Sequence, residues 1–451
     1  MFSTCWFFPV VLVVGMTAAG PTAAPAEARD PLAGLERVSA ETLTEAVLAR
    51  NAGLDALRAA LVAARARVVP AGSLEDPMLT YGFAPQTVDG FRTPGGDFRG
   101  PNQRIEVSQA FPWPGKLDLR EKAARFEADA AGEDIEALRL ELTAAAKAAF
   151  AEWHYVDRAL GINAATGELV DELRSSAESR YAAGIASQQD VLQAEVELER
   201  LKAERFRLER MRREITARLN ALLNRPPQNP LPAPAGLPDA RPVPSFEILR
   251  AAALAEHPEL QFLNDRIAAT ETRAELAEKE FLPDFRVFTG YNSLWDENIK
   301  RWIVGASINV PIGRDKRHAA LDEARANTRR LEAELADRRA TLLGALEESR
   351  AAVAESVATV ALYREELIPL SMENLSAAGA AYGAGGGRFL DVIVAEQRAL
   401  EAQLGLERAK SDYLNHRAEL ERWTGGALDS LPLPSGQMTE ATLPSPRSDE
   451  S

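Results

Sequence analysis

The spacing of hydrophobic residues changes within each half of the chain and predicts helices joined to short strands. Alanine- and leucine-rich stretches with helical spacing cover residues 40–69 and 246–281, and each leads to a proline. Beyond these prolines the apolar side chains occupy every second position in four segments: 78–84, 104–111, 285–291 and 301–310. A period of two is typical of strands with one apolar face. Each half is therefore expected to contain a helix followed by two strands.

Helical spacing then returns over much longer stretches. It covers residues 117–180 and 317–381, and at 1.5 Å per residue each predicted helix would be ~95 Å long. Gly161 and Gly167 are positions where the first could be interrupted. A glycine-containing turn leads from each into a returning helix of about 35 residues with apolar heptads, which predicts coiled-coil packing. The heptad residues are Ala194, Leu201, Leu208, Ile215 and Leu222, then Val392, Ala399, Leu406, Tyr413 and Leu420.

The two halves of the chain are copies of one unit. Residues of the first turn recur in the second at a constant shift of 201, from 181 to 382: Tyr181 and Tyr382, Gly184 and Gly385, Asp190 and Asp391. A unit of about 200 residues is too long for a solenoid repeat, so each copy is expected to form half of one architecture. The predicted organisation is a first repeat at 29–224, a proline-rich linker at 225–245 and a second repeat at 246–425.

Both ends of the chain are expected to lie outside these repeats. Residues 6–16 form an apolar run of about a dozen residues, too short for a bilayer helix of roughly 20. Small residues follow this run, so residues 1–28 are predicted to be a secretory signal peptide. Residues 426–451 are rich in proline and serine and are predicted to be a disordered tail.

Composition excludes several classes of function. The 52 basic and 67 acidic side chains give the 451-residue chain a net charge of −15, which argues against a nucleic-acid partner. Cys5 is the single cysteine, and the four histidines are scattered along the sequence. These residues form no spacing typical of a metal site or a catalytic nucleophile, so we expect no cofactor, no metal centre and no enzyme activity.

The four predicted strands restrict how the chain could enter a membrane. Backbone groups in hydrocarbon must all be paired, so strands can cross a bilayer only as a closed barrel, and the smallest barrels need about eight strands. One chain supplies four, and three copies supplying twelve is the simplest closed arrangement. The alternative from the residues alone is a water-soluble protein in which two hairpins cap a helical bundle.

Three phrases of the sequence resemble the TolC family of outer-membrane efflux proteins. They are the strand-to-helix segment 108–116 (SQAFPWPGK) and the turns at 180–195 (RYAAGIASQQDVLQAE) and 381–396 (AYGAGGGRFLDVIVAE). The resemblance covers roughly residues 40–424. The phrases at 76–79 (DPML) and 100–116 are similar to the heavy-metal branch of this family, the CzcC/CusC type.

The resemblance implies a mainly α-helical fold with a small β part, in which a β-hairpin and a long α-helical hairpin are duplicated. Three copies would form a homotrimer with a twelve-stranded β-barrel in the outer-membrane lipid of a Gram-negative bacterium. A twelve-helix α-barrel would continue through the periplasm. The barrel strands of one copy would thus be a third of the total.

The function implied by the resemblance is a passive exit duct of a tripartite efflux system. Its partners would be a periplasmic adaptor, or membrane fusion, protein and an inner-membrane pump of the RND type. Heavy-metal cations are the implied substrate, with drug efflux and type I protein secretion as alternatives. A periplasmic coiled-coil scaffold without a pore is the alternative from another class.

The resemblance also assigns a role to the tips of the helical hairpins. In the family these tips contact the adaptor. They correspond here to Ala183, Gly184 and Ile185, and to Ala384, Gly385 and Gly386. Glycine permits the positive φ with which a helix reverses in a few residues, so the same residues could also be turn residues alone.

A gate at the entrance is implied by residues near the same tips. Tyr382 and Asp391 match the family's gate tyrosine and an entrance aspartate, and Asp190 matches the partner aspartate of the first tip. Arg388 lies one position from the usual gate arginine, and Val394 replaces a second acidic residue. Three Asp391 carboxylates around a narrow axis would attract cations. Both aspartates could instead cap the returning helices.

Overall fold

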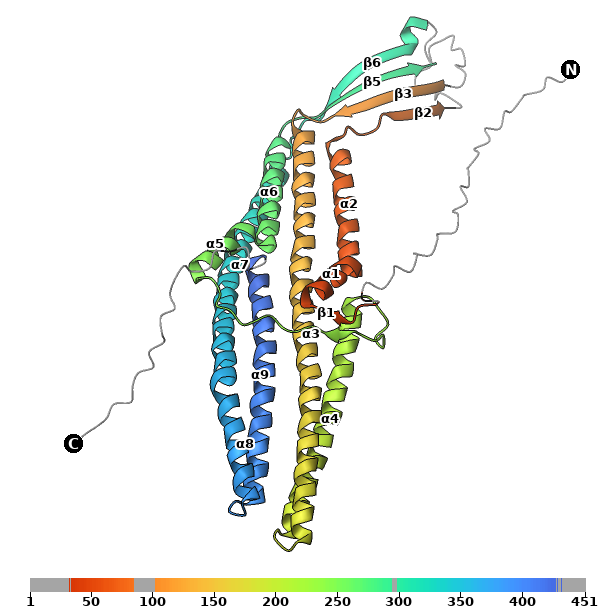
Figure 1. Cartoon of the computed structure of the whole chain (residues 1–451). Helices are drawn as coiled ribbons and strands as arrows, with labels where there is room; N and C mark the ends of the chain where they lie inside the picture. The colour runs from red at the N-terminus through yellow and green to blue at the C-terminus, as the bar shows by residue number, and fades with distance from the viewer. Residues whose placement is uncertain are drawn as a thin grey trace, which may run out of the picture.

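The protein is an elongated molecule with a β-sheet at one end and two helical hairpins extending from it (Figure 1). The computed structural model describes residues 32, 34–84, 102–293, 298–426, 428 and 431. Three parts of the predictions lie outside the described residues: the signal peptide at 1–28, residues 100 and 101 of the phrase at 100–116, and all of the predicted tail except 426, 428 and 431.

The first repeat contains one uninterrupted helix that runs most of the length of the molecule. Its elements are α1 (Ala40–Arg50), α2 (Ala52–Gly72), β2 (Met78–Ala84), β3 (Asn102–Phe111), α3 (Lys116–Ala182) and α4 (Gln188–Leu222). Gly161 and Gly167 do not interrupt α3. The single helix predicted at 40–69 is wrong, because Asn51 has an extended backbone and its side chain caps α2 by accepting the Gly53 amide.

The second repeat follows the same order with more breaks. Its elements are α5 (Phe246–Glu256), α6 (Pro258–Lys279), β5 (Phe285–Asn292), the short helix η1 (Asn298–Arg301), β6 (Trp302–Ile308), α7 (Arg314–Leu362), the π-helical turn η2 (Tyr363–Leu367), α8 (Ile368–Gly383) and α9 (Phe389–Thr424). His257 separates α5 from α6, so the helix predicted at 246–281 is also two helices.

The stretch predicted at 317–381 is helical throughout, but it is not one regular α-helix, because a π-helical turn lies inside it. Pro369 lies inside this range and lacks the amide hydrogen that a continuous helix needs, and the π-helical turn η2 directly precedes α8. On the facing helix, Gly405 makes room for the ring of Tyr363, which a side chain at 405 would overlap. The break therefore depends on residues from both helices of the hairpin.

The strands form one antiparallel sheet in the order β2-β3-β5-β6. Pairing places Tyr81 opposite Ile105, Ile105 opposite Tyr291, and Tyr291 opposite Trp302, so one row of side chains crosses all four strands. Both edge strands, β2 and β6, are without a further strand in the described part of the chain. A second, two-stranded sheet joins β1 (Arg37–Val38) to β4 (Ala233–Pro234) in the linker.

One face of the four-stranded sheet is apolar and exposed. Because side chains alternate along a strand and opposed residues share a face, the pairing assigns the following apolar residues to this apolar sheet face: Leu79, Tyr81, Phe83, Ile105, Val107, Phe111, Phe285, Val287, Tyr291, Trp302, Val304, Ala306 and Ile308. The polar residues on it are Gln103, Gln109 and Thr289. Leu79 is 69% exposed and Val304 is 80% exposed. The opposite face is mixed: it carries Glu106, Ser108, Arg286 and Ser307, together with the apolar Met78, Phe288 and Ile303.

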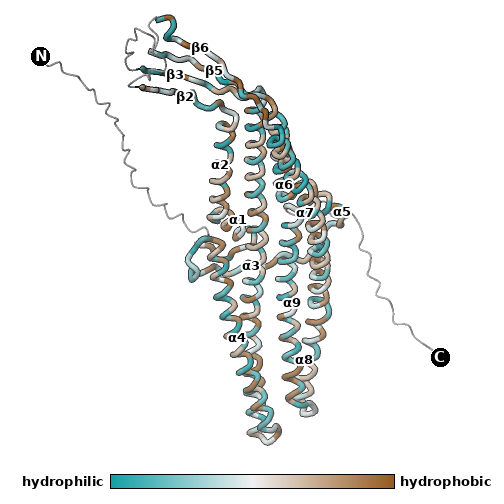
Figure 2. The backbone as a smooth tube through the Cα atoms, turned by 180° about the vertical axis from the view of Figure 1, so that it is seen from behind, coloured by the Kyte–Doolittle hydropathy of each residue, from teal (hydrophilic) through white to brown (hydrophobic). Residues whose placement is uncertain are grey.

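The buried core lies between the helices and repeats with the duplication. One cluster joins α1, α3 and α4 through residues such as Leu43, Phe150 and Leu219. Its counterpart joins α5, α7 and α9 through Leu249, Leu342 and Leu420. Hydrophilic and hydrophobic residues alternate along the whole length of these helices (Figure 2).

Within the described ranges, no helix has a stretch that is long and apolar enough to cross a membrane.

Candidate functional site

The two hairpin tips have the same backbone geometry. Gly184 has a φ of 73° and Gly385 has a φ of 82°, the left-handed region that favours glycine. In the first tip the Ile185 amide donates to the Arg180 carbonyl at 2.9 Å, and in the second the Gly386 amide donates to the Ala381 carbonyl at 3.1 Å. These bonds close each preceding helix. All six tip residues assigned from the sequence are exposed.

The two aspartates occupy equivalent positions in the first turn of the returning helices. Asp190 lies three residues after the N-cap Ser187, whose hydroxyl donates to its carboxylate at 2.8 Å. Asp391 lies three residues after the N-cap Arg388, whose guanidinium donates to its carboxylate at 2.8 Å and lowers its pKa. Each aspartate thus helps to order a helix start.

Tyr382 of the second hairpin lies near Asp190 and Arg180 of the first hairpin. The sequence analysis did not identify Arg180. Tyr382 is 8% exposed and its ring packs edge-on against Phe389, with 5.3 Å between centroids. The guanidinium of Arg180 lies 4.7 Å from the centre of the Tyr382 ring and donates to the Gly383 carbonyl at 3.2 Å. Burial and the nearby Asp190 raise the pKa of Tyr382. Arg180 therefore connects the first hairpin to the second.

Arg388 and Asp391 contact each other within one tip, and their pair is exposed. Arg388 is 78% and Asp391 49% exposed at the side chain. The sequence suggested that both belong to the gate, but it did not indicate that Arg180, at the end of the opposite hairpin's α3, makes the contact between hairpins. The sequence feature that could have identified Arg180 is its position as a basic residue directly before the first turn.

A buried pair of carboxylates lies further from the tips, between α4 and α9. Glu197 is 3% exposed and accepts bonds from Arg200 at 2.8 Å and from Gln397 at 2.7 Å. Glu396 is 2% exposed, and neither of its carboxylate oxygens has a hydrogen-bond partner among the described residues. Burial and the charge of Glu197 raise the pKa of Glu396 to about 7. Sequence reasoning did not single out this pair.

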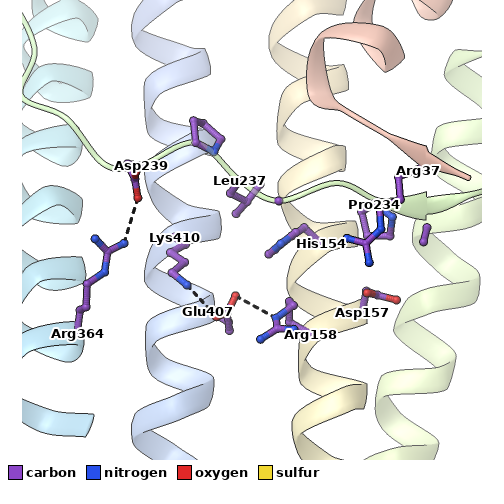
Figure 3. A pocket seen from close by; sticks show the side chains of 13 residues that line it. Arg37, His154, Asp157, Arg158, Pro234, Leu237, Asp239, Arg364, Glu407 and Lys410 are labelled. Atoms are coloured by element: carbon purple, nitrogen blue, oxygen red, sulfur yellow. Dashed lines mark hydrogen bonds and ion pairs between the residues drawn. The ribbon is translucent and has the colours of Figure 1, made fainter. Parts of the chain in front are cut away.

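A hollow lies along the helices, beside the linker (Figure 3). It has a volume of about 340 Å³ and is lined mainly by charged residues of α3, α9 and the linker. Glu407 lies between Lys410 at 2.9 Å and Arg158 at 3.8 Å, while Arg364 pairs with Asp239 at 3.5 Å. Burial lowers the pKa of His154. The Arg158–Glu407 pair thus joins α3 to α9, and the Arg364–Asp239 pair joins η2 to the linker.

No group of three or more histidine, cysteine, aspartate or glutamate side chains in the described ranges is arranged to hold a metal ion.

Comparisons with known proteins identify relatives of the same architecture. The family model described as outer membrane efflux protein matches residues 43–225 and 249–426. The outer membrane protein VceC from Vibrio cholerae is similar, with a TM-score of 0.73 and 20% identity over 86% of this chain and 96% of that chain. A membrane protein from Pseudomonas aeruginosa has a TM-score of 0.75 and 18% identity over 92% of this chain and 98% of that chain.

A third similar structure is CusC, with a TM-score of 0.74 and 16% identity over 86% of this chain and 92% of that chain. A comparison with curated protein sequences finds no match. These likenesses confirm the fold predicted from the sequence, with its duplicated strand pair and helical hairpin.

Proposed function

Because the chain belongs to the family of outer membrane efflux proteins, we propose that three copies form the passive exit duct of a tripartite efflux system. Channels of this family work as trimers with an adaptor and an inner-membrane pump. The chain would supply the route across the outer membrane, and the energy for transport would come from the pump.

The observation that carries this proposal is the apolar sheet face. An exposed apolar surface that extends over four strands is unfavourable in water and favourable against lipid. The two open edge strands, β2 and β6, leave backbone groups that require pairing in hydrocarbon. Further copies of the chain would satisfy both requirements, because β6 of one copy can pair with β2 of the next.

The hairpin tips support a contact with the adaptor. Ala183, Gly184 and Ile185 in the first tip, and Ala384, Gly385 and Gly386 in the second, are exposed at the end of the molecule far from the sheet. Ile185 is an apolar side chain that is 68% exposed, so it is available to a partner.

We further propose that Tyr382, Arg388, Asp391 and Asp190 form the entrance. Asp391 and its symmetry mates would give a ring of carboxylates at a narrow axis and would attract cations. Arg180, which contacts Tyr382, is added to this group because it joins the two hairpins. We expect Asp391→Ala to weaken the block of the channel by divalent cations.

The substrate proposed on the resemblance of the phrases at 76–79 and 100–116 is a heavy-metal cation, delivered by an RND-type pump. Expression with the adaptor and pump encoded beside this gene, in a host without its own exit ducts, is expected to raise resistance to heavy-metal cations. Resistance to drugs alone, or export of a protein, would identify one of the alternative substrates instead.

The duct itself is tested with purified protein. Protein extracted in detergent is expected to have the mass of three chains and to conduct ions across a planar bilayer. A monomer without conductance would contradict the proposal and would favour a periplasmic scaffold without a pore.

A further inference from the structure

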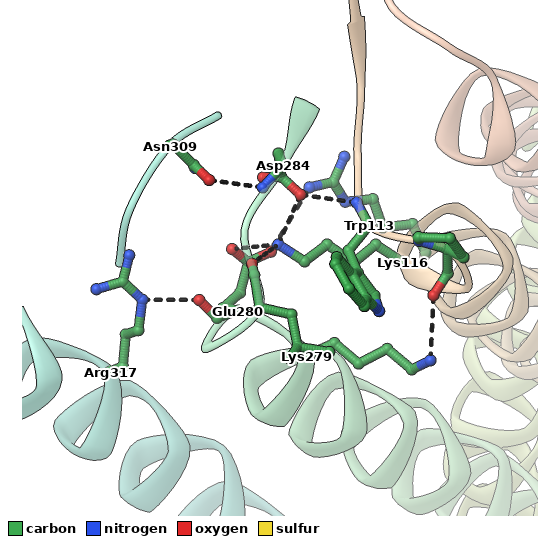
Figure 4. A network of polar contacts seen from close by, with 10 residues as sticks. Trp113, Lys116, Lys279, Glu280, Asp284, Asn309 and Arg317 are labelled. Atoms are coloured by element: carbon green, nitrogen blue, oxygen red, sulfur yellow. Dashed lines mark hydrogen bonds and ion pairs between the residues drawn. The ribbon is translucent and has the colours of Figure 1, made fainter. Parts of the chain in front are cut away.

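A buried lysine joins the two repeats where the sheet meets the helices (Figure 4). Lys116 is the first residue of α3, and its side chain is 1% exposed. Its ammonium donates to the Asp284 carboxylate at 2.9 Å, to the Leu282 carbonyl at 3.2 Å and to the Glu280 carboxylate at 3.2 Å. These three partners belong to the segment between α6 and β5 of the second repeat.

The same junction is held by further contacts between the repeats. The Asp284 carboxylate also accepts the Trp113 amide at 2.8 Å, and the indole of Trp113 stacks on the ring of Phe285 with 5.6 Å between centroids. The junction lies directly beneath the pairing of β3 with β5. The helix that follows one strand is thus bound to the segment that leads into the neighbouring strand.

The second repeat has an equivalent helix start, whose first two basic side chains are not used within the described part of the chain. Helix α7 follows the edge strand β6, and it begins with the exposed basic residues Arg314 and Lys316. Neither makes an ion pair with another residue of the described ranges. Arg317, one turn further on, donates to the Glu280 carbonyl at 2.7 Å and so contacts the same segment as Lys116 (Figure 4).

The first repeat has the complementary segment, whose acidic side chains are also unpaired among the described residues. The segment between α2 and the edge strand β2 corresponds to the one between α6 and β5, and it carries the exposed acidic residues Glu75 and Asp76. Their carboxylates make no ion pair in the described part of the chain.

Helix α2 has an exposed apolar side as well. Val62 is 67% exposed and Val69 is 72% exposed, whereas in the second repeat the corresponding helix α6 packs against both α3 and α7. In the duplicated architecture, α3 packs between α2 and α6 of its own chain. The matching neighbour on the free side of α2 would be an α7 from another copy.

We propose that α7 of one copy packs against α2 of the next, and that Arg314 and Lys316 form ion pairs there with Glu75 and Asp76. The occupant of this surface is a second copy of the chain, and each copy completes the junction of its neighbour. The ring then has two kinds of junction in alternation, one inside a chain through Lys116 and one between chains through these four residues. This inference rests on the proposed function, because it requires the trimer.

Disulfide cross-linking tests the position of these residues. In a Cys5→Ser background the chain has no other cysteine, so Asp76→Cys combined with Arg314→Cys introduces the two thiols of interest. Mild oxidation is expected to give covalent dimers and trimers. Asp76→Cys combined with Arg329→Cys is the matched control, because Arg329 is exposed about four turns further along α7 and should not cross-link.

The outcomes separate this inference from the proposed function. Trimers of normal mass in detergent that give no cross-link at 76 and 314, or that cross-link equally at 329, would overturn the inference and leave the duct intact. A protein that is monomeric in detergent would overturn both.

Charge reversal tests the ion pairs themselves. Glu75→Lys with Asp76→Lys is expected to lower the temperature at which trimers dissociate in detergent at low salt, and Arg314→Glu with Lys316→Glu is expected to do the same. Combining all four changes should restore the wild-type temperature, because the charges are exchanged. Effects of the two pairs that simply add would contradict the ion pairs.

Discussion

Two contacts at the tips are of different kinds: Arg388 and Asp391 pair within one tip, whereas Arg180 and Tyr382 join the two hairpins. Arg388 and Asp391 are three residues apart and exposed, so their ion pair contributes little to stability. Arg180 and Tyr382 come from different hairpins, and the cation lies over the aromatic ring. The distance between the two hairpin tips therefore depends more on Arg180 than on Arg388.

Replacement of Arg180 should widen the entrance. Arg180→Met keeps an apolar stem of similar length but removes the bond to Gly383 and the cation above the Tyr382 ring. We expect a higher single-channel conductance in planar bilayers. Arg388→Ser is the comparison, and a larger increase for Arg388→Ser than for Arg180→Met would show that the contact between hairpins does not hold the entrance.

Glu396 makes stability depend on pH near neutrality. Its pKa in the folded protein is about 7 against a usual value of 4.5, so the folded state binds the proton more tightly than the unfolded state. Stability is then unaffected below about pH 4.5, falls as the pH rises from there to about 7, and levels off at higher pH, where Glu396 is ionised in both states.

Glu396→Gln should therefore raise the temperature of unfolding at pH 8 and leave it almost unchanged at pH 4, with a gain on the order of 1 kcal/mol at the higher pH. Glu195→Gln is the matched control, because Glu195 is the equivalent residue of the first repeat and is exposed. An equal change for both variants, or no dependence on pH, would contradict the role of burial.

At the scale of elements, the two helical hairpins are built differently although their sequences are duplicated. Helix α3 continues without a break over 67 residues. The corresponding stretch of the second repeat is α7, the π-helical turn η2 and α8. The turn is accommodated by Gly405 of α9, which faces the Tyr363 ring.

Gly405→Ala tests this accommodation. The added methyl group would overlap the Tyr363 ring, so we expect a loss of about 1–3 kcal/mol in unfolding free energy. Gly344→Ala in α7 is the control, since the methyl group there meets open space in the chain and should stabilise the helix by about 1 kcal/mol. Denaturation midpoints of the two variants that shift in the same direction would contradict this explanation.

The glycines of the tips can be tested in the same way. A side chain added at Gly184 or Gly385 would meet no other atom of the described residues. Its cost would come from the positive φ and from contact with any bound partner. We expect Gly184→Trp and Gly385→Trp to abolish efflux in cells while trimers still assemble. Gly184→Ala, with the same strain of about 1 kcal/mol but little bulk, should retain efflux; loss of efflux in this variant as well would point to the turn and not to an adaptor.

At the scale of the whole molecule, the apolar sheet face lies at one end and the two hairpin tips lie at the other (Figure 1). A charge on that face should oppose insertion into lipid. Val304→Glu is expected to reduce the amount of protein in the outer membrane, whereas Ser307→Glu, on the opposite face of the same strand and paired with Arg286, should be tolerated. Fractionation of membranes measures both, and equal effects would argue against lipid contact on this face.

Much of this architecture follows from local patterns. The strand β2 has the bounds 78–84 expected from its alternation, and the turns at Gly184 and Gly385 lie where the glycines indicated. The breaks at Asn51 and His257 were not foreseen, because their caps are single side-chain contacts inside otherwise helical sequences. Arg180, Lys116 and Glu396 acquire their environments from segments far away in sequence, which periodicity does not report.

The unbroken length of α3 has a mechanical consequence. At 1.5 Å per residue it is a rod of ~100 Å, so a tilt of one degree about its upper end moves the lower end by roughly 2 Å. That upper end begins at Lys116, which is anchored to the second repeat, so the first hairpin can swing only by disturbing the anchor. The second hairpin contains the π-helical turn η2, and helices bend at such turns. Bending there would move α8 without moving the sheet. If the entrance opens while the sheet stays unchanged, the second hairpin would therefore move and the first would stay in place.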